Sequence, residues 1–228
     1  LRYMRRCEQG LSYPIRLSPL LQYEHKDREP ALFTRKYPVT TLVLLFFLFS
    51  IIGWCWEVVL HLLSEGTFVN RGVLHGPWLP IYGTGGVLVL LALYKLRDKP
   101  WLEFWATVVV CGVVEYFTAY YLETVYDRRW WDYAGYFLNL HGRICAEGLL
   151  VFGLGGMAVV YGVAPLFDNL LHKVRHSVLI GLCAALIALF CVDQAYSHFH
   201  PNEGEGITDE VVYKTDDARI RLDEEAFV

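Results

Sequence analysis

A long apolar run, "PVTTLVLLFFLFSIIGWCWEVVLHLL", occupies residues 38–63. Among its 26 residues, Glu57 is the only Asp, Glu, Lys or Arg. A helix needs about 20 mostly apolar residues to cross a bilayer. Residues 38–63 therefore predict a transmembrane helix, with Glu57 as a charge placed inside it.

The composition of the whole chain is too apolar for an ordinary soluble domain. Of its 228 residues, 55% are hydrophobic and only 19% are charged, and the mean hydropathy is +0.33. Soluble domains carry about 25% charged residues. A net charge of −4 gives no reason to expect nucleic acid as a partner. We predict a multi-pass protein of the cell membrane, with the lipid bilayer as its first partner.

Four more apolar runs follow the first, at residues 78–94, 101–125, 146–171 and 174–196. They predict an all-α fold, a polytopic membrane helix bundle of about five transmembrane helices. The second run is short, and Pro80 near its start removes a backbone donor. This predicts an irregular, re-entrant second helix, which is tolerated at membrane depth only where protein or water surrounds it.

The flanking segments differ from the apolar part. Residues 1–37 are polar and predicted to be cytoplasmic, residues 38–197 form the transmembrane domain, and residues 198–228 form an acidic tail predicted to be disordered. Lys and Arg gather before the first run and in the loops 95–99 and 173–175. By the positive-inside rule, the N-terminus is cytoplasmic and the C-terminus external. The six cysteines show no metal-ligand spacing, so neither a metal nor a cofactor is expected.

Ionisable side chains inside the apolar runs need a partner or a purpose, because each costs at least ~2.5 kcal/mol to insert. The carboxylates in or bordering the runs are Glu57, Glu115, Glu147 and Asp193. Because successive helices alternate in direction, helix rise places all four at one level of the membrane. With Arg71 and Arg143 nearby, they predict a shared polar cavity. For any one carboxylate alone, a hydrogen-bonded device that packs two helices is the alternative.

The loop "RWWDYAGYFLNLHGRICAEG", residues 129–148, precedes the fourth run. Its aromatic residues suit the headgroup level, so an aromatic belt is one interpretation. However, Asp132 directly follows a Trp pair, and Asn139 and Arg143 bracket Gly142. A belt requires none of these residues. We therefore predict that this loop is the rim of an outer-facing cavity.

Several strings in the chain are specific, namely "GWCWEVVL" (53–60), "GTFVNRGVLHGPWLPIYGTGG" (66–86), "VVEYFTAYYLE" (113–123), the loop quoted above and "VDQAYS" (192–197). Over about residues 45–197, the chain resembles the bacterial membrane-protein family catalogued as ABC-transporter permease, CmpB-like. The resemblance implies a transporter and a set of characteristic positions. That set comprises Glu57, Asn70, Arg71, Gly76, Pro77, Pro80, Tyr82, Gly83, Glu115, Trp131, Asp132, Tyr133, Asn139, Gly142, Arg143 and Glu147. His75 and Trp78 depart from the family pattern.

An ABC permease receives force from an ATPase through a cytoplasmic coupling segment. Here the two predicted internal loops are only about six and two residues long, which is too short for a usual coupling helix. The chain carries no P-loop motif. An ATPase or another membrane subunit would therefore be a separate partner, contacting the N-terminal segment.

Three classes of function fit these features. In a transporter or transporter subunit, Glu57 and Glu115 carry an ion or proton, and Arg71 and Arg143 hold an anionic substrate group. In an enzyme acting on a lipid-linked substrate, a buried carboxylate is the acid or base and Arg143 is an electrostatic clamp. HExxH and GxSxG motifs are missing, and Cys145 is better interpreted as a packed thiol than a nucleophile. In a structural or sensory protein, the charges only lock the bundle.

Overall fold

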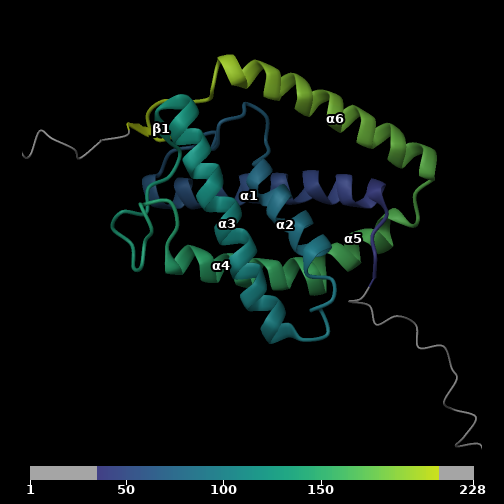
Figure 1. The fold of residues 1–228 in the computed structure, drawn as a ribbon. Coiled ribbons are helices and arrows are strands. Elements are labelled where there is room, and N and C mark those ends of the chain that lie inside the picture. The colour runs from purple at the N-terminus through teal and green to yellow at the C-terminus, as the bar shows by residue number, and fades with distance from the viewer. Residues whose placement is uncertain (1–34, 211–228) are drawn as a thin grey trace, which may run out of the picture.

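The structure, a computed structural model, describes residues 35–210. Its elements are α1 (Val39–Glu65), α2 (Pro80–Ala92), α3 (Pro100–Tyr126), β1 (Arg128–Arg129), α4 (Ala146–Ala158), η3 (Val159–Val163), α5 (Ala164–Leu171), α6 (His176–Phe199) and β2 (Asp209–Glu210). The π-helical turn η3 joins α4 to α5 without a break, so five continuous helices make up the bundle (Figure 1). β1 and β2 pair as a short antiparallel ribbon.

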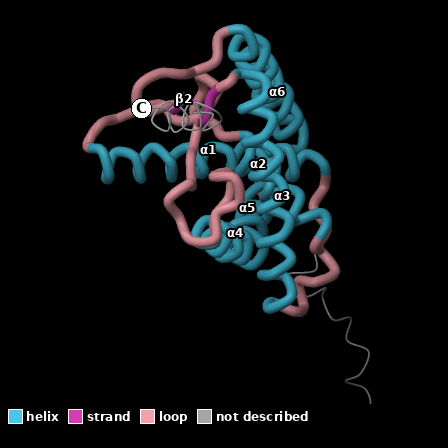
Figure 2. Tube along the Cα trace, turned by 60° about the vertical axis from the view of Figure 1, so that its left-hand side comes forward, coloured by secondary structure: helices cyan, strands magenta, loops and turns pink. Residues whose placement is uncertain are grey.

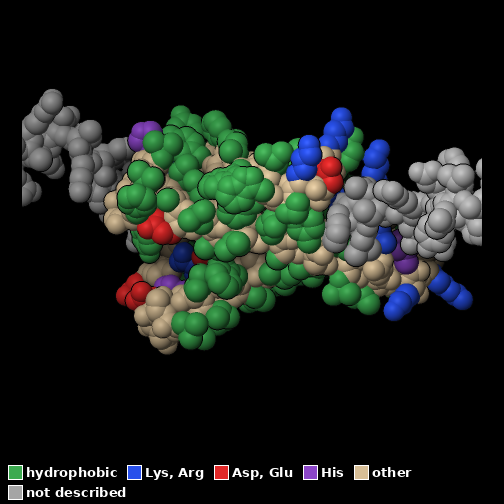
Figure 3. Space-filling view, turned by 90° about the horizontal axis from the view of Figure 1, so that it is seen from below, with side chains coloured by type: hydrophobic (Ala, Val, Ile, Leu, Met, Phe, Trp, Pro, Cys, Tyr) green, Lys and Arg blue, Asp and Glu red, His purple; other side chains and the backbone are tan. Residues whose placement is uncertain are grey.

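Four of the helices are long and apolar enough to cross a membrane: α1, α3, α4–η3–α5 and α6. α2 is also apolar but has only 13 residues. In the space-filling view, hydrophobic side chains cover the middle of the molecule and charged side chains lie mainly toward its two ends (Figure 3). The prediction of an all-α, polytopic bundle of about five helices with a short second helix is confirmed.

The helix boundaries follow from local sequence. α2 and α3 begin with Pro80 and Pro100, which suit the first turn because its amides have no intrahelical partner. α1 ends at Gly66, which has a φ of 72°. Glycine takes this left-handed conformation without steric penalty, so the chain can turn directly into the loop.

Glycines bring α2 close to α1. A Cβ on Gly83 would lie 2.5 Å from the backbone oxygen of Phe46, and Gly86 lies against the ring of Phe49. On the other side of the bundle, Gly153 of α4 fits against Phe104 of α3. Such small residues allow close helix contact in a bilayer, where association depends on packing. These contacts set the rotation of each helix about its own axis.

α6 and α4 lie on opposite sides of the bundle, with α1 and α2 between them (Figures 1 and 2). Near the start of α6, Leu179 and Cys183 pack against Leu44 of α1 and Leu171 of α5. Most of the remaining surface of α6 is exposed. α6 is therefore an outlying helix that contacts the bundle along one face, where Phe190 packs against Phe46, Phe47 and Trp78.

The chain beyond α6 lies against the loop between α1 and α2. The side-chain amide of Asn202 donates to the backbone oxygens of Asn70 and Gly72, at 2.8 and 2.9 Å. Arg71 donates to the oxygen of Gly206 at 2.7 Å. The predicted disorder of the acidic tail remains a prediction for residues 211–228, and both they and residues 1–34 lie outside the described part of the chain.

Candidate functional site

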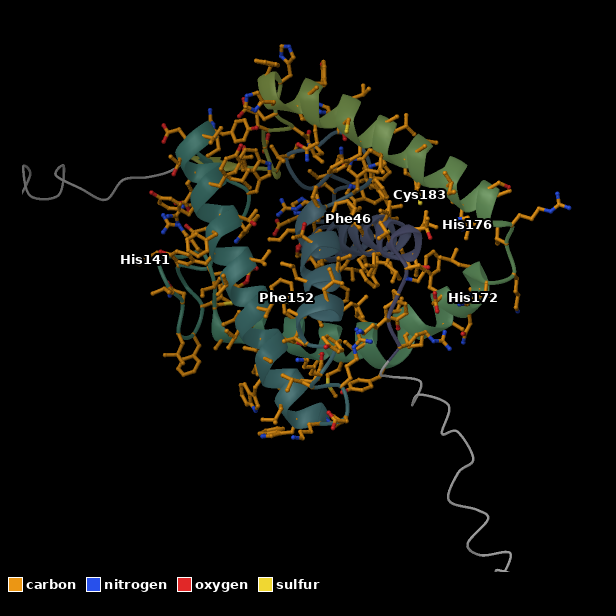
Figure 4. The ribbon with its side chains drawn as sticks, turned by 45° about the vertical axis from the view of Figure 1, so that its right-hand side comes forward. Phe46, His141, Phe152, His172, His176 and Cys183 are labelled. Atoms are coloured by element: carbon orange, nitrogen blue, oxygen red, sulfur yellow. The ribbon has the colours of Figure 1, made fainter. Side chains whose placement is uncertain are left out.

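A cavity of about 630 Å³ lies between α1, α2, α3 and α4–η3. Its walls are mostly apolar, and include Phe49, Trp56 and Phe152. The ring of Phe152 lies edge-on to Tyr82 of α2, with 5.9 Å between centroids, in the interior of the bundle (Figure 4). Volumes of 300–1,000 Å³ with apolar walls and a few polar groups are usual for small-molecule sites.

The polar groups of the cavity form two tyrosine–carboxylate pairs. The Tyr82 hydroxyl donates to Oε1 of Glu57 at 2.7 Å, and the Tyr133 hydroxyl donates to Oε1 of Glu115 at 3.2 Å. All four residues line the cavity. Burial raises the pKa of Tyr133, so its hydroxyl keeps its proton and remains a donor. The structure thus brings together Glu57, Tyr82 and Glu115 from the predicted site.

Glu115 is the least satisfied of these groups. It is 3% exposed, and its Oε2 has no hydrogen-bond partner among residues 35–210. A buried carboxylate oxygen without a donor is costly unless a proton or a cation reaches it. This atom therefore marks where a ligand or proton would bind.

Arg71 lies beside the cavity and is held by the protein. Its Nε lies 3.8 Å from Oε2 of Glu57. Its other nitrogens donate to the backbone oxygens of Gly206 and Trp130, at 2.7 and 3.1 Å. Arg71 therefore joins α1, the loop 127–145 and the chain after α6, and both of its terminal nitrogens donate to backbone oxygens.

A second polar cluster centres on Glu123, near the end of α3. Its Oε2 accepts hydrogen bonds from Nε and Nη2 of Arg143, at 3.0 and 2.6 Å. Its Oε1 lies 3.0 Å from Nε of Arg129. Hydrogen bonding to Glu123 raises the pKa of Arg143, which also donates to the Tyr116 hydroxyl. The predicted site residue Arg143 is thus brought to Glu123, which the sequence interpretation did not select.

Glu123 could have been found from its spacing. It follows Glu115 by eight residues, so the two carboxylates lie along one i, i+4 row of α3. Its position near a helix end gives no such signal, because charged residues are ordinary there.

Asp132 and Asn139 shape the loop 127–145. Asp132 accepts from the amide of Ala134 at 2.9 Å and pairs with Arg129 at 3.2 Å. The Asn139 side chain donates to two backbone oxygens of the same loop and accepts from the amide of Gly142. Gly142 has a φ of 69°, and a Cβ there would collide with the Asp132 carboxylate. Both polar residues therefore act within the loop rather than at the cavity wall.

Glu147 and Asp193 lie away from the cavity. Oε1 of the exposed Glu147 accepts from the amide of Phe137 at 3.3 Å. Asp193 accepts from the amide of Gly76 at 3.0 Å and from the indole of Trp78 at 2.7 Å. Of the four carboxylates predicted at one level, two line the cavity and two hold loops.

Replacing Asp193 with alanine is expected to lower the free energy of unfolding by about 1.5–3 kcal/mol, the usual range for hydrogen bonds to a charged group. The reason is that the loop 66–79 loses its anchor on α6. Unfolding in mixed detergent micelles measures the change. Gln194→Ala at the exposed neighbouring position is the control, and equal stability of the two variants would contradict the anchoring role.

A further buried polar cluster lies at the opposite end of the bundle. Asp168 of α5 pairs with Arg35 at 2.8 Å and accepts from the Thr41 hydroxyl at 3.2 Å. Arg97, only 1% exposed, donates to the backbone oxygens of Arg35 and Leu90. Burial lowers the pKa of Arg97. The sequence interpretation counted Arg97 as a topological loop charge and did not select Asp168.

The Cys145 thiol is positioned as a helix cap. The residue is 1% exposed, and its sulfur accepts from the amide of Gly148 at 3.4 Å. Burial raises the pKa of Cys145, which opposes the thiolate form that a nucleophile requires. His141 lies in the loop 127–145, away from Phe152 in the interior (Figure 4). Within residues 35–210, no group of three His, Cys, Asp or Glu could hold a metal ion.

Four apolar spans and a cavity lined by two tyrosine–carboxylate pairs define a multi-pass membrane protein of a transporter-related class. The family described as "Putative ABC-transporter type IV", the CmpB family, matches residues 44–198. The chain belongs to this family, as the resemblance of its motifs implied. Searches of curated proteins and of solved structures returned no match.

Proposed function

We propose that the chain is a transporter permease or transporter subunit whose cavity takes up an apolar molecule bearing a cationic or hydrogen-bond-donating group. The observation that carries the proposal is the 630 Å³ cavity with its two carboxylates, one of which has an unpartnered buried oxygen. Apolar walls suit the body of such a molecule. The carboxylates suit its polar group, and aromatic faces add a favourable interaction with a cation.

The charge expected on the polar group of the substrate follows from the hydrogen bonds that Arg71 and Arg143 already make. Arg71 donates to backbone oxygens, and Arg143 is bound to Glu123 and Tyr116. An anionic substrate group would have to displace these acceptors. Glu115, in contrast, lines the cavity and has a buried oxygen without a hydrogen-bond partner among residues 35–210. The geometry therefore favours a cation or a proton over the anionic group that the arginines first suggested.

Access to the cavity is expected from the bilayer, between α1 and α4. Trp56 and Leu60 of α1 and Val151 and Leu154 of α4 line the cavity and are also exposed. In a membrane, this lateral opening faces lipid tails, so an amphipathic molecule can enter from the leaflet.

The basic loops 93–99 and 172–175 favour a cytoplasmic N-terminus and an external C-terminus. The polar end of the cavity then faces outward. An ATPase, where one takes part, is a separate subunit, because these inner loops are short.

Binding of tetraphenylphosphonium tests the proposal, with tetraphenylborate as a probe of the same shape and opposite charge. We expect the cation to bind at least about tenfold more tightly, a difference of about 1.4 kcal/mol. Glu57→Gln and Glu115→Gln should each weaken cation binding, because each removes a carboxyl group that can carry a negative charge in the cavity. Equilibrium dialysis of purified protein in detergent measures both dissociation constants.

Glu65→Gln is the matched control, because Glu65 is exposed at the end of α1 and does not line the cavity. Tighter binding of the borate would contradict the proposal and favour an anionic substrate held by Arg71 and Arg143. Equal dissociation constants for the two probes would show that the cavity binds apolar molecules without selecting their charge, which would also contradict the proposal.

A further inference from the structure

An i, i+4 row of polar residues runs along α3: Glu103, Thr107, Cys111 and Glu115. Glu103, Thr107 and Glu115 are buried, at 0%, 0% and 3% exposure. Cys111 is half-buried and lines the cavity. At 1.5 Å per residue, the row spans about 18 Å along the helix axis. This covers more than half of the hydrocarbon thickness of about 30 Å.

Glu103 lies at the inner end of the row. Its Oε1 accepts from the Thr107 hydroxyl at 2.9 Å. Its Oε2 is buried without a hydrogen-bond partner in the described part of the chain. The ionisable groups that act on its charge from neighbouring segments are Arg97 and Tyr161, and the Tyr161 hydroxyl donates to the backbone oxygen of Arg97 at 3.0 Å. Glu103 and Glu115 thus share one unusual feature, a buried oxygen suited to receiving a proton.

The cavity reaches toward the middle of the row. A Cβ on Gly156 of α4 would lie 3.2 Å from Oγ1 of Thr107. Gly156 lines the cavity together with Cys111, and so do Val159 and Val163 of the π-helical turn. π-helical turns inside α-helices occur often at functional sites. Gly156 therefore lies between the hydrogen-bonded Glu103–Thr107 pair and the cavity that Glu115 lines.

We propose that this row is a proton path that links the Arg97 end of the bundle to the substrate cavity, an inference that rests on the proposed transport function. The Glu103 carboxylate takes up a proton and becomes a neutral acid. The proton passes through the Thr107 hydroxyl, which accepts one proton as it donates another, and then through water in the cavity beside Cys111. The Glu115 carboxylate receives it, and Glu103 returns to its anionic form.

The arrival of the proton couples the path to the substrate. A protonated Glu115 no longer attracts a cationic group, so proton delivery favours release of the cation from the cavity. No bond other than those to the proton is made or broken. In this proposal a proton gradient is the energy source. A proton that enters the cavity is exchanged for a lipophilic cation that leaves it.

The test measures proton entry into vesicles of phosphatidylethanolamine and phosphatidylglycerol that contain the full-length protein, tetraphenylphosphonium as the exchanged cation and the pH-sensitive dye pyranine. A potassium gradient with valinomycin supplies the driving potential. We expect protein-dependent acidification in the wild type, and at least about a tenfold slower rate in Glu103→Gln, because a buried acid of the relay is lost. Glu103→Asp should restore part of the rate.

A second pair of variants tests the path even if the Glu103→Gln protein fails to fold. Thr107→Val should slow proton entry, and Thr107→Ser, which keeps the hydroxyl, should not. Thr124→Val is the matched control, because Thr124 is exposed on the same helix and donates to the backbone oxygen of Tyr120. Wild-type rates in both Glu103→Gln and Thr107→Val would overturn the proposal, as would a wild-type rate equal to that of protein-free vesicles.

Tetraphenylphosphonium binding on the same preparations separates the path from the proposed function. Glu103 does not line the cavity, so Glu103→Gln should keep the dissociation constant within about twofold of wild type. Slow proton entry with unchanged binding supports the path. Proton entry that depends on Glu103 in a protein that does not bind the cation would support the path and contradict the proposed substrate.

Discussion

Replacing Glu123 with alanine is expected to lower the free energy of unfolding by about 3–5 kcal/mol, as removal of one partner from a buried ion pair does. Glu123 forms ion pairs with both Arg129 and Arg143, at 3.0 and 2.6 Å. These three side chains are only 10–20% exposed. Without the carboxylate, two guanidinium groups remain close together with little solvent to screen them. Unfolding in mixed detergent micelles, followed by circular dichroism, measures the loss.

Glu65→Ala is the control for this experiment, because Glu65 is an exposed carboxylate at the end of another spanning helix. It should change stability by less than about 0.5 kcal/mol, as surface substitutions usually do. If Glu123→Ala cost less than about 1 kcal/mol, the cluster would behave as a solvent-screened surface pair. The inference that Glu123 stabilises the contact between α3 and the loop 127–145 would then be wrong.

Replacing Gly83 with alanine is expected to cost about 3 kcal/mol, at the upper end of the usual range for overpacking a core. The new Cβ would lie 2.5 Å from the backbone oxygen of Phe46 and would collide with the hydroxyl of Ser50. The backbone oxygen cannot rotate away as a flexible side chain can. α2 would have to shift away from α1. Tyr82, the residue directly before Gly83, would shift with it. We therefore expect loss of cation binding together with loss of stability.

Gly181→Ala supplies the matched control for Gly83→Ala. Gly181 lies on α6, and a Cβ there would meet no atom within 4 Å in the described chain. Alanine is favoured over glycine inside a helix by about 0.5–1 kcal/mol, so this variant should be as stable as the wild type or slightly more stable. Thermal unfolding in detergent distinguishes the two variants. Equal melting temperatures would show that α1 and α2 are not held by the close contact at Gly83.

The helices were predictable because hydropathy is a local property of the chain. The predicted run 146–171 coincides with α4–η3–α5, and the run 101–125 differs from α3 by one residue at each end. The insertion cost of a charge also pointed to Glu57 and Glu115, which line the cavity. Tyr82 was reached only through the family resemblance, because a tyrosine in an apolar helix carries no signal of its own.

The buried charges near the helix ends were missed. Glu103, Glu123 and Asp168 all lie within one or two turns of a helix end, where charged side chains usually reach water. Their burial depends on which segment covers that end. Glu123 is covered by the loop 127–145, and Asp168 by the chain before α1. Neither contact has a counterpart in the local sequence.

The positions of the membrane helices, and the need of their internal charges for partners, follow from local sequence, because both depend on the transfer of nearby side chains out of water. Which partners meet depends on how the helices pack. Helix depth placed Glu57, Glu115, Glu147 and Asp193 at one level, but the rotation of each helix decides where its side chains point. Contacts such as Gly83 on Phe46 set that rotation, and they join residues far apart in the chain. They direct Glu57 and Glu115 into the cavity, while Asp193 binds the loop 66–79 and Glu147 the loop 127–145.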